Sequence, residues 1–174
     1  MQVGEKDCDS FGDKSELRRA MLARRRAQGS LEIARASRAV TKYCLDIVSD
    51  RLPLAIHCYK GLERLGEIDT TELIGELKSR FPGSRVDVAS VSATALKPEV
   101  SYDLIFIPVV AFDRGGFRLG MGGGWYDAFL AEQPQAFKVG LAYEWAEVAS
   151  LPTEPHDVHL DVVVTPSGIQ TCSQ

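Results

Sequence analysis

The sequence has little of what marks membrane, secreted or nucleic-acid-binding proteins. Its longest strongly apolar run, Leu104–Phe112, is far shorter than the roughly 20 residues of a membrane-spanning helix. Its four cysteines include no Cys-x-x-Cys pair, and the opening stretch MQVGEKDCDSFGDK lacks the apolar core of a signal peptide. A net charge of −4 and a pI of about 5.4 give no overall attraction to nucleic acid. These absences predict a soluble cytoplasmic protein with free thiols and with neither membrane nor nucleic-acid partners.

The chain also lacks the familiar catalytic and phosphate-binding signatures. No nucleophile motif is present. From Gly120 the glycine spacing matches the first two positions of the dinucleotide-binding motif Gly-x-Gly-x-x-Gly. Trp125 occupies the position of the third glycine. No lysine follows the glycines, which excludes a P-loop. Any ligand must therefore be bound in another way.

What is present is an alternation of helical and strand patterns. The length of 174 residues and the 45% hydrophobic content fit one domain at 13–174, behind a flexible tail at 1–12. The alternation predicts a three-layer α/β/α fold with a mostly parallel, doubly wound sheet. Helices are expected at 13–28, 31–48, 69–80 and 125–132, and strands at 52–59, 85–91, 103–110, 137–143 and 160–165.

The stretch FDRGGFRLGMGGGWYD, residues 112–127, holds six of the fifteen glycines within ten residues. It follows the most apolar expected strand, and ligands of open α/β sheets bind beyond the carboxyl ends of strands. Backbone N–H groups at the start of the next helix can hold an anion, and Arg114 and Arg118 add positive charge. The alternative is a glycine-rich surface turn without a ligand.

The longer string DLIFIPVVAFDRGGFRLGMGGGWYDAFL, residues 103–130, resembles the signature of the 5-formyltetrahydrofolate cyclo-ligase family. KSELRRAMLARRR, residues 14–26, resembles the N-terminal helix of that family, and residues 139–169 resemble its closing segment. The resemblance implies an ATP- and Mg²⁺-dependent enzyme that closes 5-formyltetrahydrofolate into 5,10-methenyltetrahydrofolate. ATP would phosphorylate the formyl oxygen, N10 would attack the carbon, and phosphate would leave. It implies a small folate as partner and a monomer or weak homodimer.

The same resemblance implies roles for individual residues. ATP would contact Lys14 and Arg18 of the first helix and the whole loop, namely Arg118, Leu119, Gly120, Met121, Gly122, Gly123, Gly124, Trp125 and Tyr126. Arg118 and Tyr126 would be catalytic. The folate would contact Leu62, Glu67, Trp125 and Tyr126. Asp127 and Asp157 would hold Mg²⁺, which favours carboxylate oxygens.

Several of these positions also have a plainer interpretation. On a helical wheel Lys14, Arg18 and Arg25 fall within about 40°, so one basic stripe would face a triphosphate. A solvated charged face is the alternative, and the run 24–26 points three ways. Glu67 has the alternative of an exposed acid near a helix start, and Asp127 that of a favourable charge on the helix dipole.

The histidines are less informative. HDVHLD, residues 156–161, has the residue types of a transition-metal site, but its short spacing after a proline favours a loop. The resemblance leaves His156 and His159 as bystanders of Asp157. His57, inside an expected strand, is interpreted as a core residue.

The chain departs from the family pattern in its middle. The gap between 80 and 103 is shorter than usual, so a wall of the folate pocket is expected to be missing. Met121 and Trp125 replace the usual residues of the loop. Three hypotheses follow: an active cyclo-ligase with an open pocket, a member that binds nucleotide or folate without turnover, and an enzyme of the same fold acting on another metabolite.

Overall fold

The computed structural model describes residues 13–89 and 100–173. The expected tail at 1–12 and the end of the expected strand 85–91 lie outside the described residues. No helix among the described residues is long and apolar enough to cross a membrane.

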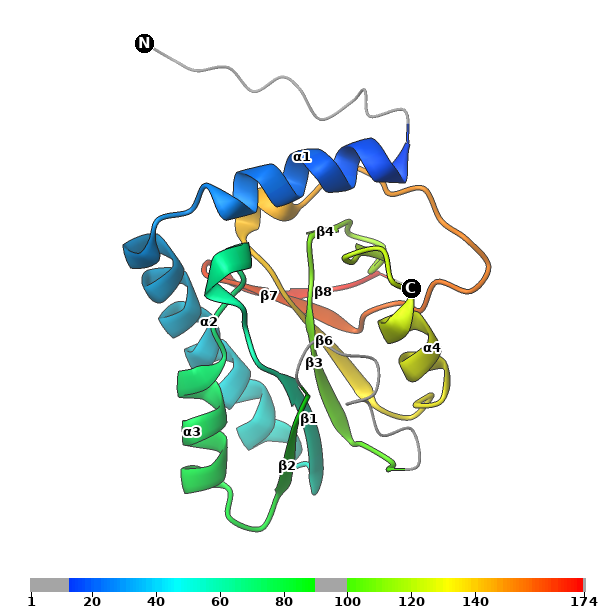
Figure 1. Cartoon of the computed structure of the whole chain (residues 1–174). Coiled ribbons are helices and arrows are strands. Elements are labelled where there is room, and N and C mark those ends of the chain that lie inside the picture. Colours follow the sequence, from blue (N-terminus) through cyan, green and yellow to red (C-terminus); the bar gives the residue numbers. More distant parts are fainter. Residues whose placement is uncertain (1–12, 90–99, 174) are drawn as a thin grey trace.

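A six-stranded sheet forms the centre of the molecule, in the order β2-β1-β3-β6-β7-β8 (Figure 1). The pairs from β2 to β7 are all parallel, and β8 runs antiparallel to β7. The sheet is therefore mostly parallel and doubly wound, as the sequence predicted. Its strands are β1 (Ala55–Tyr59), β2 (Arg85–Ala89), β3 (Leu104–Pro108), β6 (Phe137–Leu141), β7 (Val162–Thr165) and β8 (Gly168–Thr171).

Helices cover both faces of the sheet and complete the three predicted layers. α2 (Ser30–Arg51) and α3 (Thr71–Arg80) lie on one face, and α4 (Trp125–Ala131) lies on the other (Figure 1). α1 (Lys14–Arg26) crosses the edge at which the parallel strands end. The remaining elements are the two-stranded sheet of β4 (Ala111–Phe112) and β5 (Arg118–Leu119) and the short helices η1 (Glu63–Leu65) and η3 (Glu144–Ala146).

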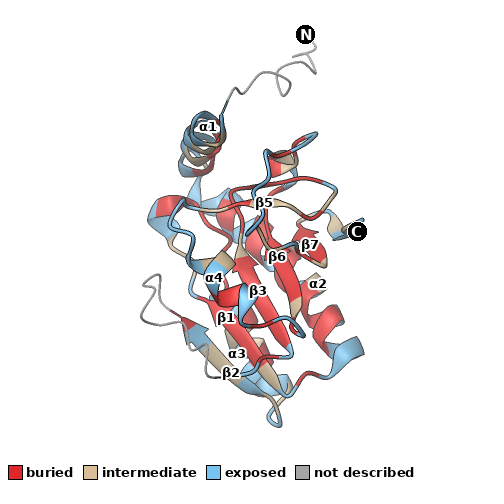
Figure 2. Cartoon of the chain, turned by 90° about the vertical axis from the view of Figure 1, so that its right-hand side faces the viewer, coloured by how far each residue is buried: buried red, intermediate tan, exposed pale blue. Residues whose placement is uncertain are grey.

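The core lies on both faces of β3, as its unbroken apolar sequence predicted. Leu104 and Phe106 pack in the cluster under α2 and α3, whereas Ile105 and Ile107 pack in the cluster with α4. All four are fully buried, and most residues of the inner strands are buried (Figure 2). A third cluster, which includes Leu17 and Met21, attaches α1 to the loops that follow the strands.

Aspartates lie at the starts of two helices, and only the first of them is the N-cap residue of its helix. The carboxylate of Asp13, the N-cap of α1, accepts a hydrogen bond from the Ser15 amide at 2.7 Å. At α3 the N-cap is Thr70, while the preceding Asp69 accepts from the Thr71 amide at 3.0 Å. These caps fix where the two helices begin.

Candidate active site

A pocket of about 490 Å³ opens where the parallel strands end. Tyr59, Ala89 and Pro108, the last residues of β1, β2 and β3, line its floor. The chain order reverses between β1 and β3, and such a switch point is where open α/β sheets bind ligands. The fold alone therefore favours this pocket as the functional site.

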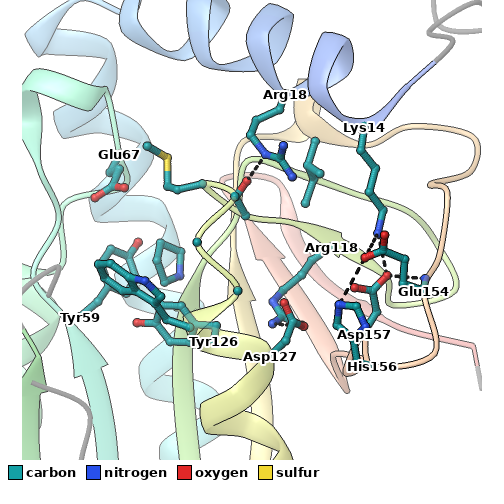
Figure 3. A pocket seen from close by; sticks show the side chains of 18 of the residues that line it. Lys14, Arg18, Tyr59, Glu67, Arg118, Tyr126, Asp127, Glu154, His156 and Asp157 are labelled. Carbon is teal, nitrogen blue, oxygen red and sulfur yellow. Dashed lines mark hydrogen bonds and ion pairs between the residues drawn. The ribbon is translucent and has the colours of Figure 1, made fainter. Parts of the chain in front are cut away.

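The glycine loop, Gly120–Gly124, forms one wall of the pocket and leads into α4. Gly122 and Gly124 have φ of 95° and 68°, a region that side chains with a Cβ rarely adopt. A Cβ on Gly123 would lie 2.8 Å from Nε1 of Trp125. Arg18 fastens the loop by donating to the Gly120 carbonyl at 2.9 Å (Figure 3). The loop borders a cavity and is not an isolated surface turn.

The basic stripe expected on α1 is only partly correct. Lys14 and Arg18 line the pocket, as predicted. Arg25 does not: its side chain is 3% exposed and donates to the Leu65 carbonyl at 2.9 Å. The helical wheel ignored the rise along the axis, which separates Lys14 from Arg25 by about 16 Å, too far to share one phosphate.

The other two arginines of that cluster also turn away from one another. Arg24 lies over the Trp145 ring at 4.5 Å, and Arg26 is exposed. The three consecutive arginines thus have three separate environments.

Arg118 and Asp127 form an ion pair at the centre of the pocket. Arg118 Nη2 lies 2.8 Å from Asp127 Oδ1, and the guanidinium also donates to the Val158 carbonyl. The Val158 amide donates to the same Asp127 oxygen at 3.3 Å. Burial lowers the pKa of Arg118, and the Asp127 carboxylate counteracts part of that effect. The guanidinium of Arg118 is therefore charged and fixed in orientation, with its side chain only 4% exposed.

A second charged group closes one end of the pocket (Figure 3). Lys14 Nζ lies 2.9 Å from Asp157 Oδ2 and 3.5 Å from Glu154 Oε2. Partial burial acts to raise the pKa of Asp157. Hydrogen bonds from Lys14 and the Glu154 amide outweigh this effect, and the pKa of Asp157 is lowered. His156 Nε2 lies 3.3 Å from Glu154 Oε2, and the ligand atoms of Glu154, His156 and Asp157 lie within 4.8 Å of one another.

Sequence reasoning missed Glu154. The sequence signal for it is an acid three residues before Asp157 with Pro155 between them, a pattern typical of a turn. In that turn the Asp157 carboxylate accepts a hydrogen bond from the Glu154 amide at 2.8 Å. His156 lines the pocket, whereas His159 packs on the Phe117 ring outside its lining.

The opposite end of the pocket is formed by Glu67 and Tyr59 (Figure 3). Glu67 is 4% exposed, so the interpretation as an exposed acid was wrong. Burial raises the pKa of Glu67, while Arg25 and the Leu62 amide, which donates at 2.9 Å, oppose that rise. Leu62, which was expected to touch the substrate, is not among the residues that line the pocket, and its contact with the pocket residue Glu67 is this amide.

The aromatic pair Trp125 and Tyr126 also lines the pocket. Trp125 is 37% exposed. Burial raises the pKa of Tyr126, so its hydroxyl stays protonated. His57 does not line the pocket: it is 1% exposed and packs on Tyr102 and Phe129 as a core residue.

The residue types at the two ends differ in a chemically useful way. The glycine loop with Lys14, Arg18 and Arg118 fits a polyphosphate. Glycines have no Cβ to keep an anion from their backbone amides, and the three cations suit anionic oxygens. The nearby carboxylates of Asp127 and Asp157 are the ligand type that Mg²⁺ accepts. The Glu67 end, with its aromatic rings, fits a flat polar heterocycle.

Fold and pocket together define the class: a doubly wound α/β protein whose site, at the switch point of the sheet, combines anion-binding and cation-binding groups. A model of the 5-formyltetrahydrofolate cyclo-ligase family matches residues 89–166. The Haemophilus influenzae 5-formyltetrahydrofolate cyclo-ligase is 31% identical over 167 residues, covering 78% of this chain and 88% of that protein. This chain therefore belongs to the 5-formyltetrahydrofolate cyclo-ligase family and is an enzyme of the ligase class.

Further comparisons agree with that membership. The 5-formyltetrahydrofolate cyclo-ligase of Mycoplasma genitalium is 26% identical over 163 residues, which cover 87% of this chain and 97% of that one. The solved structure of Aquifex aeolicus 5,10-methenyltetrahydrofolate synthetase superposes with a TM-score of 0.75 at 26% identity, over 92% of this chain and 93% of that one. The similarity extends over nearly the whole of both chains.

Proposed function

We propose that this protein closes 5-formyltetrahydrofolate into 5,10-methenyltetrahydrofolate with the consumption of ATP, in the presence of Mg²⁺. Family membership supports the reaction. The observation that carries the proposal is the two-ended pocket: cations and the glycine loop at one end, a buried carboxylate and aromatic rings at the other. One pocket is thus suited to a nucleotide and a pterin side by side.

The nucleotide end would hold the triphosphate of ATP. Lys14, Arg18 and Arg118 supply positive charge, and the loop Gly120–Gly124 borders the same space. Phosphoryl transfer needs positioning and charge neutralisation more than a covalent nucleophile, and these groups provide both. Asp127 and Asp157 would hold Mg²⁺, whose chemistry is to screen the phosphate charges.

Binding of the nucleotide exchanges ion partners within the pocket. Lys14 is paired with Asp157, and Arg118 with Asp127. Each pair contains one proposed phosphate ligand and one proposed metal ligand. When phosphate takes the cations, both carboxylates become free for the metal, so neither charge is left unpaired in the pocket.

The folate end would bind the pterin through Glu67, Trp125 and Tyr126. A carboxylate accepts two adjacent N–H groups bidentately, which is the pattern that an aminopyrimidine ring presents. Trp125 would stack on the ring. The protonated Tyr126 hydroxyl, between the two ends, would donate to the formyl oxygen or the transferred phosphoryl group.

In the reaction, the γ-phosphoryl group passes to the formyl oxygen and ADP is released from it. N10 then attacks the activated carbon and loses its proton, the carbon–oxygen bond to phosphate breaks, and inorganic phosphate leaves with that proton. Arg118 is the residue best placed to stabilise charge on the transferred group, because its buried guanidinium lines the pocket beside the glycine loop.

The test is the absorbance of methenyl-folate during incubation with 5-formyltetrahydrofolate, Mg²⁺ and ATP. We expect an ATP-dependent rise that falls about 100-fold or more in Asp127→Asn. Glu132→Gln, an exposed acid at the end of the same helix, is the matched control and keeps the activity. A flat trace with ATP still bound would favour a binding protein without turnover. ATP hydrolysis that needs a different co-substrate would favour another metabolite.

A further inference from the structure

Arg25 contacts two residues of the pocket lining, Glu67 and Met121, although it does not line the pocket itself. It comes from the last turn of α1 and is 3% exposed. Its Nε donates to the Leu65 carbonyl at 2.9 Å, which fastens α1 to the segment after β1. Burying a guanidinium costs free energy that only well-placed partners offset. The hydrogen-bond partners of Arg25 therefore indicate its role in the protein.

One branch of the guanidinium serves the folate end. Arg25 Nη2 lies 3.4 Å from Glu67 Oε1, while the other oxygen of Glu67 accepts from the Leu62 amide at 2.9 Å. Both oxygens of a carboxylate buried to 4% exposure are therefore oriented by the protein. Without Arg25 this carboxyl would keep only one neutral hydrogen bond against the cost of burial.

The same nitrogen also contacts the glycine loop. Arg25 Nη2 donates to Met121 Sδ at 3.3 Å, and Met121 belongs to the glycine loop that Arg18 also fastens. One guanidinium thus contacts the segment after β1 and the loop before α4. Glu67 of the first segment and Met121 of the second both line the pocket.

We propose that Arg25 is a positioning residue that holds the Glu67 carboxylate ionised and oriented for the folate and links it to the glycine loop through Met121. The part that concerns folate rests on the proposed function. The part that concerns Glu67 and Met121 rests on the contacts of the protein alone.

The ionised state of Glu67 depends on every charged or titratable group around it. Arg25 from α1 is the strongest favourable one, and burial is the main opposing effect on the pKa of Glu67. The other groups near this carboxyl are Arg64 in η1, Tyr59 at the end of β1, Tyr126 in α4 and Tyr143 after β6. Since the three tyrosines are neutral at pH 7, Arg25 and Arg64 are the cations that keep Glu67 charged.

The first test needs no activity. The carboxyl of Glu67 is followed by NMR in protein labelled with ¹³C-glutamate, in wild type, Arg25→Met and Arg26→Met. We expect its titration midpoint to rise by about one pH unit or more in Arg25→Met. Arg26, exposed one residue away, is the matched control and leaves the midpoint unchanged. An unchanged midpoint in Arg25→Met would overturn the proposal, whether or not the protein is a cyclo-ligase.

The second test separates positioning from mere stability. In Arg25→Met we expect the KM for 5-formyltetrahydrofolate to rise about 10- to 100-fold, with a partial return in Arg25→Lys. If Arg25→Met fails to fold, the double variant Arg25→Met/Glu67→Gln removes the unpaired charge and restores folding without restoring folate affinity. A lowered unfolding midpoint with an unchanged KM and pH profile would mean that Arg25 is only structural.

Discussion

Gly66 offers a sharp test of how the folate end is built, because it supports both Glu67 and Arg25. It ends η1 with φ of 63° and ψ of 29°, in the left-handed region. A Cβ placed there would lie 2.0 Å from the carbonyl oxygen of Arg25 and 2.7 Å from its carbonyl carbon. Both atoms belong to the backbone of α1, so no side-chain rotation can relieve the overlap. In Gly66→Ala, α1 must therefore move away from the segment after β1.

The expected cost has two parts. The left-handed conformation costs an alanine about 1–2 kcal/mol. Forcing a methyl group into a packed contact typically costs a further amount of about 1–3 kcal/mol. We therefore expect the free energy of unfolding to fall by about 2–5 kcal/mol, a large share of the roughly 5–15 kcal/mol of a normal domain.

The assay is urea unfolding followed by circular dichroism, with two matched glycine variants. Gly124 is also left-handed, but a Cβ placed on it would have no other atom within 4 Å, so Gly124→Ala measures the conformational cost alone. Gly75 is exposed inside α3 with open space around it, so Gly75→Ala should stabilise by about 0.5–1 kcal/mol. If Gly66→Ala costs no more than Gly124→Ala, the close contact with Arg25 does not limit the fold and the reasoning is refuted.

Two further predictions concern His57 and Lys14. Burial lowers the pKa of His57 to about 4, with Asp87 acting in the opposite direction, while an unfolded histidine titrates near 6.5. The unfolded chain therefore binds the extra proton first, and stability is lost as pH falls from about 6.5 to 4, by about 3 kcal/mol. In His57→Phe, urea midpoints at pH 7 and pH 4.5 should differ less than in wild type, and an equal drop in both proteins would contradict this. Lys14→Met should raise the KM for ATP about tenfold or more, as expected for a lost phosphate contact. It should change stability by less than about 1 kcal/mol, because its pair with Asp157 is partly exposed. A change in the folate KM instead would place Lys14 at the wrong end of the pocket.

The fold could be predicted from the sequence where burial dictates the pattern. β3 is apolar at every position because both of its faces are covered, and its predicted range of 103–110 contains the observed Leu104–Pro108. β8 was missed because it is an edge strand with mostly exposed residues, so no hydrophobic alternation marks Gly168–Thr171. β4 and β5 were missed because strands of two residues have no period to detect.

The site could be predicted where one stretch of sequence carries it, and not where distant segments meet. The glycine loop, Lys14 and Arg18 line one pocket, and the sequence could indicate this because their spacing follows from one loop and one helix. Their contacts with ATP stay a prediction. The burial of Arg25 was missed, because its partners Glu67 and Met121 lie 42 and 96 residues away in the chain. Periodicity gives the face of a helix but not what another loop brings to that face.

Three carboxylates of the pocket are each paired with a cation from a different helix or strand. They are the two proposed for Mg²⁺ and the buried Glu67. Lys14 pairs with Asp157, Arg118 with Asp127, and Arg25 with Glu67. The first two cations line the pocket and can exchange their carboxylates for phosphate, whereas Arg25 is behind the wall and cannot. A pair that must open for a ligand is expected to be partly exposed, because separating buried charges costs several kcal/mol. The side chains of Lys14 and Asp157 meet this expectation, at 22% and 15% exposed, and so does Asp127 at 26%. Arg118 is only 4% exposed, close to the 3% and 5% of Arg25 and Glu67. We therefore expect Lys14 and Asp157 to separate when a nucleotide binds, and Arg25 and Glu67 to stay paired.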